Sequence, residues 1–229
     1  MKLPISDRLL ACAGFVQKGD RVADIGCDHG YLSIYLLQNG IAAGCIAADV
    51  NEGPLRSAKT NARKFGVADR MEFCLSDGAQ SIPHGFDVMV CAGMGADTMV
   101  HILKCAPWLR NPRYRLVLQC QSKTPMLRRY LSDHGWRIAE ESVLRDGRFL
   151  YTVMNVVYDP AQPVQQAGEA YFPGVLLNNP SEDVPAYYRW VRDGLRIATA
   201  HQDDEEKKRA LAYLEELAAR NPILQEECV

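Results

Sequence analysis

A short stretch near the N-terminus, Arg21–Tyr31 (RVADIGCDHGY), constrains the fold more than any other part of the chain. Its first five residues predict a buried strand, which Gly26 and Gly30 then interrupt before a helical run over residues 32–38. A strand, a glycine turn and a helix form the ligand-binding corner of a doubly wound α/β sheet. There the backbone approaches a ligand closely, and the helix N-terminus directs free N–H groups at it.

Strand and helix patterns alternate over the rest of the first 158 residues. Two alternating patterns joined by a turn at Asp146-Gly147 predict a terminal hairpin. We therefore expect an α/β fold, with a Rossmann-like, mainly parallel sheet and an antiparallel C-terminal hairpin strand. Strands are expected at 21–25, 43–49, 71–75, 86–91, 115–119, 136–144 and 149–158, and helices at 6–16 (with Ser6 as N-cap), 32–38, 53–65, 97–105 and 124–134.

The chain changes character after Asp159–Pro163, a short stretch rich in proline and glutamine that is typical of a linker. Beyond it the pattern becomes helical, and apolar stripes predict two helices. Asp203 is the expected N-cap of the second helix, because Glu206 three positions later completes a capping box. Two helices alone bury little surface, so they must pack on the main domain or on another chain. The expected domains are 1–159, and 160–229 with a linker and a small all-α, coiled-coil-like hairpin.

Composition and charge narrow the functional classes. Hydrophobic residues make up 48% and charged residues 24% of the 229 residues, as in ordinary soluble proteins. No run is long enough to span a bilayer and the first ten residues lack a signal-peptide core, so we expect a cytoplasmic protein. The residues before Pro180 include 19 basic and 17 acidic side chains, against 7 and 11 from Pro180 onward. A polyanion is therefore expected to touch the first part more than the tail.

Eight cysteines are present, but none forms a Cys-x-x-Cys pair. Several fall in apolar strand patterns, so buried free thiols in a reducing compartment are expected, with Cys27 set apart by its place in the glycine turn. The five histidines show no metal-ligand spacing, and we predict no metal site.

The spacing in the glycine turn indicates the kind of ligand. A dinucleotide fingerprint has a middle glycine where this chain has Asp28. A carboxylate there would repel a pyrophosphate and suit an ammonium or sulfonium group, which favours S-adenosylmethionine. A nicotinamide dinucleotide and a ligand-free glycine turn remain as alternatives.

Three further strand ends should lie at the same edge of the sheet. Asp49 is placed to accept hydrogen bonds from a ribose, and Asp77 from an adenine amino group. The fourth strand ends in residues 92–95 (AGMG), which offer backbone carbonyls but no polar side chain. Methylation of a ring nitrogen fits this composition, since its lone pair needs positioning rather than proton removal. The candidate cofactor-binding residues are Asp24, Gly26, Cys27, Asp28, His29, Gly30, Asp49, Val50, Asp77, Gly78, Ala92, Gly93 and Gly95.

Residues 24–32 (DIGCDHGYL), 92–95 (AGMG), the Leu118-Gln119 strand end and residues 127–136 resemble the bacterial tRNA (adenine-22-N1)-methyltransferase family (TrmK type). The resemblance covers essentially the whole chain. It implies a class I methyltransferase domain over 1–159, S-adenosylmethionine as donor, and N1 of an adenine in the D-loop region of tRNA as acceptor. The chain departs from the family pattern near Ser33, at Ala96 and at Cys120-Gln121, and the last departure borders the predicted acceptor pocket.

On this resemblance Asp28 and Tyr31 shape the transfer site and Met94 lines it. Tyr31 would stack on an adenine removed from its own stack. Candidate phosphate contacts are Arg8, Arg56, Lys59, Arg63, Arg128 and Arg129. A methyltransferase of another RNA or a small molecule, a non-catalytic S-adenosylmethionine-binding module and, less favoured because of Asp28, an NAD-dependent oxidoreductase remain alternatives. The oligomeric state stays open between a monomer and a weak dimer.

Overall fold

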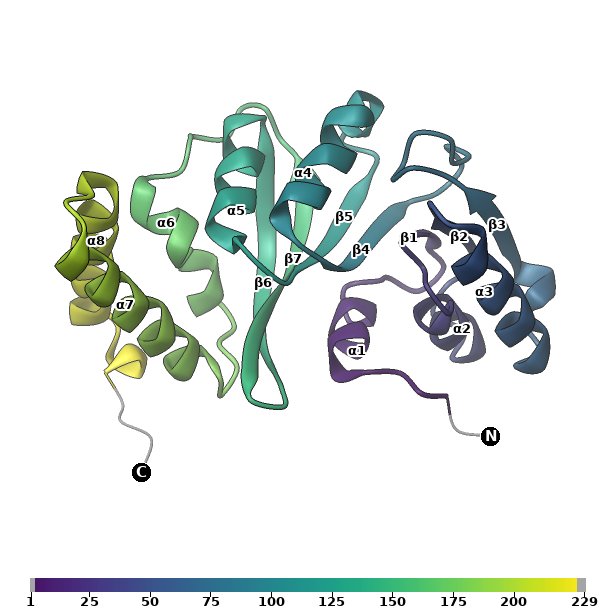
Figure 1. The fold of residues 1–229 in the computed structure, drawn as a ribbon, viewed down its shortest axis with the longest axis horizontal. Helices are drawn as coiled ribbons and strands as arrows, with labels where there is room; N and C mark the ends of the chain where they lie inside the picture. The colour runs from purple at the N-terminus through teal and green to yellow at the C-terminus, as the bar shows by residue number, and fades with distance from the viewer. Residues whose placement is uncertain (1–2, 226–229) are drawn as a thin grey trace.

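A computed structural model describes residues 3–225. One seven-stranded sheet runs through the molecule, with the N-terminal helices near one end and a helical hairpin at the other (Figure 1). The strands are β1 (Arg21–Ile25), β2 (Gly44–Asp49), β3 (Met71–Leu75), β4 (Val88–Met94), β5 (Arg115–Cys120), β6 (Trp136–Asp146) and β7 (Phe149–Tyr158). The helices are α1 (Asp7–Ala13), α2 (Tyr31–Gln38), α3 (Glu52–Lys64), α4 (Ala96–Cys105), α5 (Thr124–Asp133), α6 (Ala167–Tyr171), α7 (Val184–His201) and α8 (Glu205–Arg220), with short 3-10 turns η1 (Ala68–Arg70), η2 (Pro107–Leu109), η3 (Gly174–Leu177) and η4 (Pro222–Leu224).

The strand order is β3-β2-β1-β4-β5-β7-β6, and only β7 runs antiparallel to its neighbours. The chain winds outward from β1 through β2 to β3, then returns to place β4 on the other side of β1. The expected mainly parallel sheet with an antiparallel hairpin strand is confirmed. The switch in winding between β1 and β4 opens a crevice at their carboxyl ends.

Helices cover both faces of the sheet. A hydrophobic core lies on each face of the sheet, and alternate side chains of β1 pack into one or the other. Ala23 and Ile25 pack towards α4 and α5, whereas Val22 packs towards α1, α2 and α3. Central strands buried on both faces explain why β1, β2 and β4 read as nearly continuous apolar runs.

The end of β4 differs from the expectation. The strand continues to Met94 rather than ending at Cys91, because Ala92 still pairs with Gln119 and Met94 with Cys120. Gly93 forms a bulge between them, at φ +79°, a conformation that favours glycine. The residues 92–94 expected in a loop therefore belong to the strand, and the bulge turns its end towards the crevice.

The N-caps of α1 and α8 can be compared with those expected from the sequence. The Ser6 side chain accepts a hydrogen bond from the Leu9 N–H, as expected, although α1 already ends at Gly14. Asp203 is not the cap of α8; Asp204 is, and its carboxylate accepts from the N–H groups of Glu206 and Lys207, each at 3.1 Å. The expected capping box is therefore not formed: the residue three positions after the cap is Lys207, whose ammonium pairs with the Asp204 carboxylate.

The helical hairpin α7–α8 packs on the main domain. Its apolar side chains form a third core with Val143 of β6 and with Phe172 and Leu176, which lie next to α6 and in η3. The short helix α6 and the turn η3 lie between the expected linker and the hairpin, where the sequence shows no helical period. Together they cover β6, which would otherwise leave an open sheet edge.

All seven cysteines in residues 3–225 are free thiols, and five of them are buried; Cys228 lies outside the described residues. Cys105 is exposed and Cys74 is partly buried. Within the same range, no helix is both long enough and apolar enough to cross a membrane.

Candidate functional site

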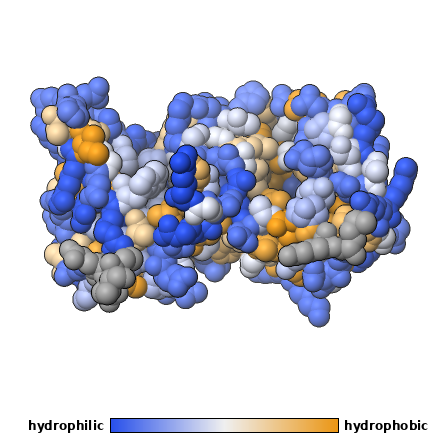
Figure 2. Space-filling view, turned by 60° about the horizontal axis from the view of Figure 1, so that its bottom comes forward, coloured by the Kyte–Doolittle hydropathy of each residue, from blue (hydrophilic) through white to orange (hydrophobic). Residues whose placement is uncertain are grey.

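A cleft of about 550 Å³ lies at the carboxyl ends of β1, β4 and β5, where the switch in winding predicts a ligand site. The segment before α1 and the first residues of α1 close one side of it. Figure 2, which brings the lower side of the view in Figure 1 forward, shows hydrophobic residues gathered on part of this face. The lining residues are Pro4, Ser6, Arg8, Leu9, Asp24, Gly26, Cys27, Asp28, His29, Tyr31, Leu32, Ala92, Gly93, Met94, Gln119 and Gln121.

The glycine turn is held by the neighbouring strand. The N–H groups of Gly26 and Cys27 both donate to the Ala48 carbonyl of β2, at 2.8 and 3.0 Å. Gly26 has φ +70°, Asp28 has φ +49° and Gly30 has φ +71°, so three residues in the turn adopt the left-handed conformation. Left-handed backbone is unusual for a residue with a side chain, and at Asp28 it directs the exposed carboxylate to the mouth of the cleft.

Asp24 lies deep in the cleft and is almost fully buried. Burial raises the pKa of this carboxyl from 3.8 to about 6, although the Ser33 hydroxyl opposes the shift by donating a hydrogen bond at 2.8 Å. A carboxyl with a raised pKa in a cleft marks a functional-site candidate.

Three carboxylates surround the turn. Asp49 accepts hydrogen bonds from the N–H groups of Asn51 at 2.9 Å and Asp28 at 3.4 Å. The pKa of the Cys27 thiol is raised by burial and then by the charges of Asp24, Asp49 and Asp28. The turn therefore sits in a negative potential, which favours a cationic ligand and an unreactive thiol.

The end of β4 forms the opposite wall. The buried Gln119 side chain accepts from the Gly93 N–H at 3.0 Å, and the Gln121 N–H donates to the Met94 carbonyl at 2.9 Å. The Met94 side chain lies against Gly26, where a Cβ would overlap its methyl group. The glycine is thus needed both for its left-handed backbone and for its close approach to Met94.

Aromatic rings stand at the mouth of the cleft. The rings of His29 and Tyr31 are stacked with centroids 5.4 Å apart, and the His29 ring lies 3.6 Å from the Asp28 carboxylate. Asp28 and His29 have side chains that are 72% and 50% exposed. A planar ligand entering the cleft would meet this pair first.

The structure brings together only part of the expected cofactor set. Asp24, Gly26, Cys27, Asp28, His29, Ala92 and Gly93 line the cleft, as do Tyr31 and Met94. Asp77 lies outside it, with its carboxylate 3.8 Å from His101, and Gly78 packs on Ile102. The other expected residues outside the lining are Gly30, Asp49, Val50 and Gly95.

The expected phosphate contacts separate into three groups. Arg8 lines the cleft and pairs with Asp146 at 2.7 Å. Arg129 is partly exposed and pairs with Glu206 of α8. The remaining surface candidates follow one exposed face of α3: Arg56, Lys59 and Arg63.

The expectation was wrong for Arg128. Its side chain is fully buried and contacts Glu141 at 2.5 Å, the Tyr187 hydroxyl at 3.2 Å and the carbonyls of Ala170 and Tyr171. A guanidinium without contact with solvent cannot reach a phosphate on the surface. Its role is to join α5 to β6 and to the C-terminal helices.

For several residues the sequence contains no indication that they would line the cleft. Pro4, Ser6 and Leu9 reach the cleft through the placement of the N-terminal segment, and Leu32 reaches it from the first turn of α2. Gln119 offered one clue, as a polar residue at the end of an apolar strand. Among residues 3–225, no cluster of three or more His, Cys, Asp or Glu side chains could hold a metal ion.

Comparisons with known proteins agree with this geometry. A family model described as a methyltransferase domain matches residues 5–154. The tRNA (adenine(22)-N(1))-methyltransferase of Bacillus subtilis (strain 168) is 32% identical over 180 residues, which cover 77% of this chain and 72% of that relative. The crystal structure of the B. subtilis m1A22 tRNA methyltransferase TrmK has a TM-score of 0.77 at 25% identity, and covers 98% of each chain. A Streptococcus pneumoniae structure in complex with S-adenosyl-L-methionine has a TM-score of 0.81 at 27% identity, and covers 96% of this chain and 99% of that one. The chain therefore belongs to the TrmK-type family of class I methyltransferases.

Proposed function

We propose that the protein transfers a methyl group from S-adenosylmethionine to N1 of adenine 22, in the D-loop region of tRNA. The observation that carries the proposal is the glycine turn ringed by carboxylates at the switch between β1 and β4. Membership of the TrmK-type family supports the choice of donor and acceptor. A tRNA substrate is also consistent with a cytoplasmic location.

The residues of the cleft fit this donor. S-adenosylmethionine has a cationic sulfonium and an ammonium group, and the turn offers the carboxylates of Asp24, Asp28 and Asp49. We assign Asp24 to the ammonium group of the amino-acid end and Asp28 to the sulfonium side of the donor. Asp49 and Val50, at the end of β2 just outside the cleft lining, are assigned to the ribose. Asp77 and Gly78 are assigned to the adenine, which would extend past the cleft lining towards the end of β3. The Asp49 carboxylate already accepts two N–H groups but retains further lone pairs for ribose hydroxyls.

Transfer to N1 requires no general base, because the ring nitrogen presents its lone pair in the plane of the base. The donor supplies an electrophilic methyl carbon, whose bond to sulfur breaks as the bond to N1 forms. The electron pair stays on sulfur and the positive charge moves to the adenine. The protein must therefore align the two reactants in a dry site, and positioning of this kind can supply most of the acceleration.

Residues at the mouth of the cleft are assigned to the acceptor. The stacked rings of Tyr31 and His29 offer a face to an adenine removed from its stack. The Asp28 carboxylate favours the positive charge that develops on the methylated base. Met94 fills the wall behind the glycine turn and limits how far the base can enter.

The test is methyl transfer from labelled S-adenosylmethionine to unmodified tRNA transcripts, with the modified position mapped by reverse-transcriptase stops. We expect a stop at adenine 22 that requires the donor and is lost with Asp24→Ala. Asp28→Asn is expected to lower kcat by roughly 10- to 100-fold, as expected for loss of one oriented charge at the reacting atoms. Asp69→Asn, an exposed aspartate outside the cleft, is the matched control and should behave like the unaltered protein. Donor binding without transfer to any tRNA would contradict the proposed substrate.

A further inference from the structure

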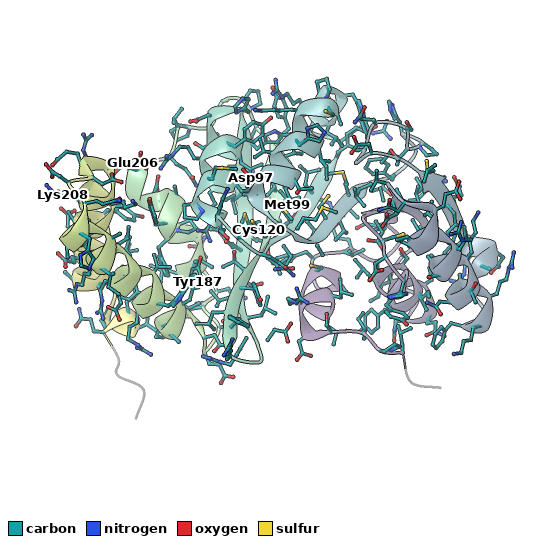
Figure 3. The ribbon with its side chains drawn as sticks, viewed as in Figure 1. Asp97, Met99, Cys120, Tyr187, Glu206 and Lys208 are labelled. Atoms are coloured by element: carbon teal, nitrogen blue, oxygen red, sulfur yellow. The ribbon has the colours of Figure 1, made fainter. Side chains whose placement is uncertain are left out.

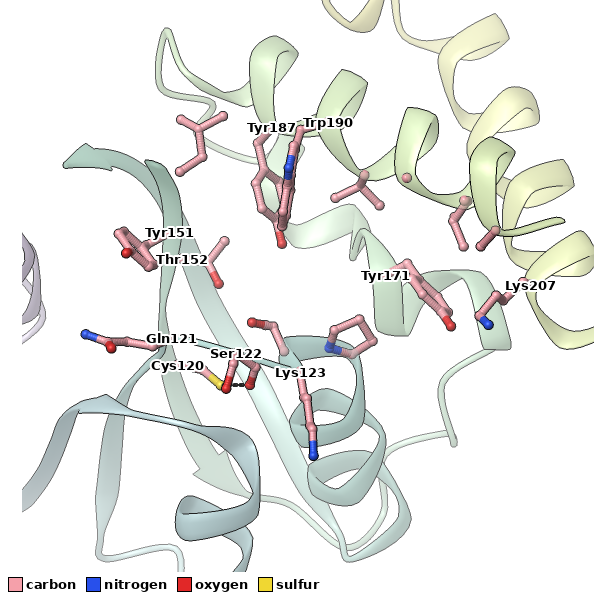
Figure 4. A pocket seen from close by; sticks show the side chains of 17 residues that line it. Cys120, Gln121, Ser122, Lys123, Tyr151, Thr152, Tyr171, Tyr187, Trp190 and Lys207 are labelled. Atoms are coloured by element: carbon pink, nitrogen blue, oxygen red, sulfur yellow. Dashed lines mark hydrogen bonds between the residues drawn. The ribbon is translucent and has the colours of Figure 1, made fainter. Parts of the chain in front are cut away.

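A second hollow, the hairpin pocket, lies between the C-terminal hairpin and the main domain. Its volume is about 340 Å³, and it separates α7 from the end of β5, the start of α5 and β7 (Figure 4). Cys120 marks the end of β5, and Tyr187 projects from α7 (Figure 3). None of the residues assigned to methyl transfer lines this pocket.

Aromatic rings form much of its wall. Tyr187 and Trp190 come from α7, with ring centroids 5.8 Å apart, and Tyr171 and Tyr151 approach from α6 and β7 (Figure 4). Tyr187 is buried, and its hydroxyl is held by Arg128 at 3.2 Å, so this ring is fixed in place. Trp190 is 64% exposed, which leaves a large indole face at the pocket mouth. Rigid aromatic faces of this kind are platforms for stacking of nucleobases.

Polar groups accompany the rings. The backbone turn after β5 places Gln121, Ser122 and Thr124 along the lower wall, where amide and hydroxyl groups can bond to a base edge. Lys123 and Lys207 also line the pocket, and their ammonium groups pair with Asp97 at 2.8 Å and Asp204 at 2.9 Å. The Lys123–Asp97 pair is exposed and the Lys207–Asp204 pair is partly exposed; ion pairs that solvent reaches are weak, so a phosphate can compete for these lysines.

The hairpin pocket adjoins the candidate active site. Gln121 lines both hollows, so a single loop after β5 separates them. A polynucleotide that delivers one base to the methyl-transfer cleft can therefore place a neighbouring nucleotide in the hairpin pocket. The volume lies at the lower end of the range for small-ligand sites and suits one nucleoside.

From these observations we infer that the hairpin pocket binds an unpaired nucleobase of the tRNA substrate, stacked on Trp190, with its phosphate near Lys123 or Lys207. The inference rests on the proposed function, because it takes tRNA to be the substrate. It gives the C-terminal hairpin a direct part in substrate binding, and makes Trp190 a binding residue outside the cleft.

The chain offers a matched pair of variants on one helix. Ala198 lines the hairpin pocket, whereas Ala200 is exposed on α7 and does not line it. Ala198→Leu fills the pocket without removing any group, and Ala200→Leu adds the same side chain elsewhere. Trp190→Ala removes the stacking face, and Trp190→Phe keeps an aromatic ring.

The experiment measures tRNA affinity without donor, KM and kcat for tRNA, donor affinity and Tm for each variant. We expect Trp190→Ala to raise Kd and KM for tRNA by roughly 5- to 150-fold, the range for loss of one stacked base. Ala198→Leu should act in the same direction, Trp190→Phe should be close to the unaltered protein, and donor affinity should not change. Ala200→Leu should bind tRNA normally.

A fluorescence measurement identifies the stacked base. 2-Aminopurine is placed at one unpaired D-loop position of the tRNA at a time, and docking in the pocket should quench one position only in proteins that retain Trp190. If Trp190→Ala and Ala198→Leu bind tRNA like Ala200→Leu while the unaltered protein methylates adenine 22, the pocket inference is overturned and the proposed function stands. If the unaltered protein methylates no tRNA, the proposed function itself fails.

Discussion

At the scale of single residues, the candidate site depends on side chains held in unfavourable states. Asp24 is a carboxyl buried on the floor of the cleft, and Asp28 adopts a left-handed backbone. Neither state stabilises the folded protein by itself. Both make sense if the cleft is built for a cationic ligand, because a cation would favour the ionised carboxylates that burial disfavours.

The first prediction concerns Asp24 and pH. Its pKa is raised from 3.8 to about 6, so the folded protein binds the proton more tightly than the unfolded chain does. The free energy of unfolding should therefore fall as pH rises from about 4 to about 6, by about 3 kcal/mol in total. Asp24→Asn removes this dependence, and should raise Tm at pH 7 relative to the unaltered protein while weakening donor binding. Equal Tm differences between the two proteins at pH 4 and pH 7 would contradict the assignment.

The second prediction separates two roles of Gly26. Gly26→Ala should lower the free energy of unfolding by about 1–2 kcal/mol through its left-handed backbone. It should also weaken donor binding, because the new methyl displaces Met94 into the cleft. Adding Met94→Ala removes the overlap but leaves the backbone strain. A double-mutant cycle should therefore show coupling in donor affinity, measured by calorimetry, and purely additive effects would argue against a direct clash between the two side chains.

At the scale of elements, the C-terminal helices are fastened by one buried cluster. Arg128 of α5 contacts Glu141 of β6, Tyr187 of α7 and the carbonyls at the end of α6. The same guanidinium donates to the Thr152 hydroxyl of β7 at 3.4 Å, so five elements meet at one side chain. The hydrogen bond to Tyr187 fixes that ring in the hairpin pocket, so the cluster links the packing of the hairpin to the proposed tRNA contact.

The third prediction follows from this cluster. Arg128→Met leaves the Glu141 carboxylate buried without its partner, which should destabilise the protein by about 3–5 kcal/mol. Arg128→Met with Glu141→Leu removes both charges and should recover most of that loss. The measurement is Tm together with protease sensitivity of the α6–α8 region. Should the double variant be no more stable than Arg128→Met alone, an unpaired buried charge is not the cause.

At the scale of the whole molecule, charge is divided between the two parts of the chain. The first 179 residues have an excess of basic side chains, and α3 presents Arg56, Lys59 and Arg63 on an exposed face. Whether this face meets the tRNA backbone stays a prediction, as does the division into domains at residue 159. The salt dependence of binding is the property that tests the α3 face, because each phosphate that the protein neutralises releases counterions.

The fourth prediction uses that dependence. Changing Arg56, Lys59 and Arg63 to Gln should reduce the slope of log affinity for tRNA against log salt by about 1 for each phosphate that the variant no longer neutralises. The matched control changes Lys208, Arg209 and Arg220 of α8 to Gln, which removes the same charge from the acidic hairpin. An equal slope change in the two triple variants would show a general charge effect and not a specific interaction through α3.

The sequence by itself determined the fold and the corner to which we assign the donor. Alternating strand and helix periods, the glycine turn after β1 and the terminal hairpin are local patterns, and the parallel order follows from them. Ser6 was identified as a cap for the same reason, since its bond to Leu9 spans only three residues. The position of the cap on α8 was wrong by one residue, because Asp203 and Asp204 offer the same chemistry side by side.

Only the tertiary structure decided which residues face the cleft. Asp77 turns towards His101, outside the cleft, and residues before α1 close a wall that no motif indicated. From the sequence alone we expect Arg128 to be an exposed basic residue. In the fold it is buried in an ion pair, because Glu141 and Tyr187 contact it from 13 and 59 positions further along the chain. The hairpin pocket likewise forms between segments far apart in the chain. Interactions of this kind leave no local period in a sequence, so they appear only when the chain has packed.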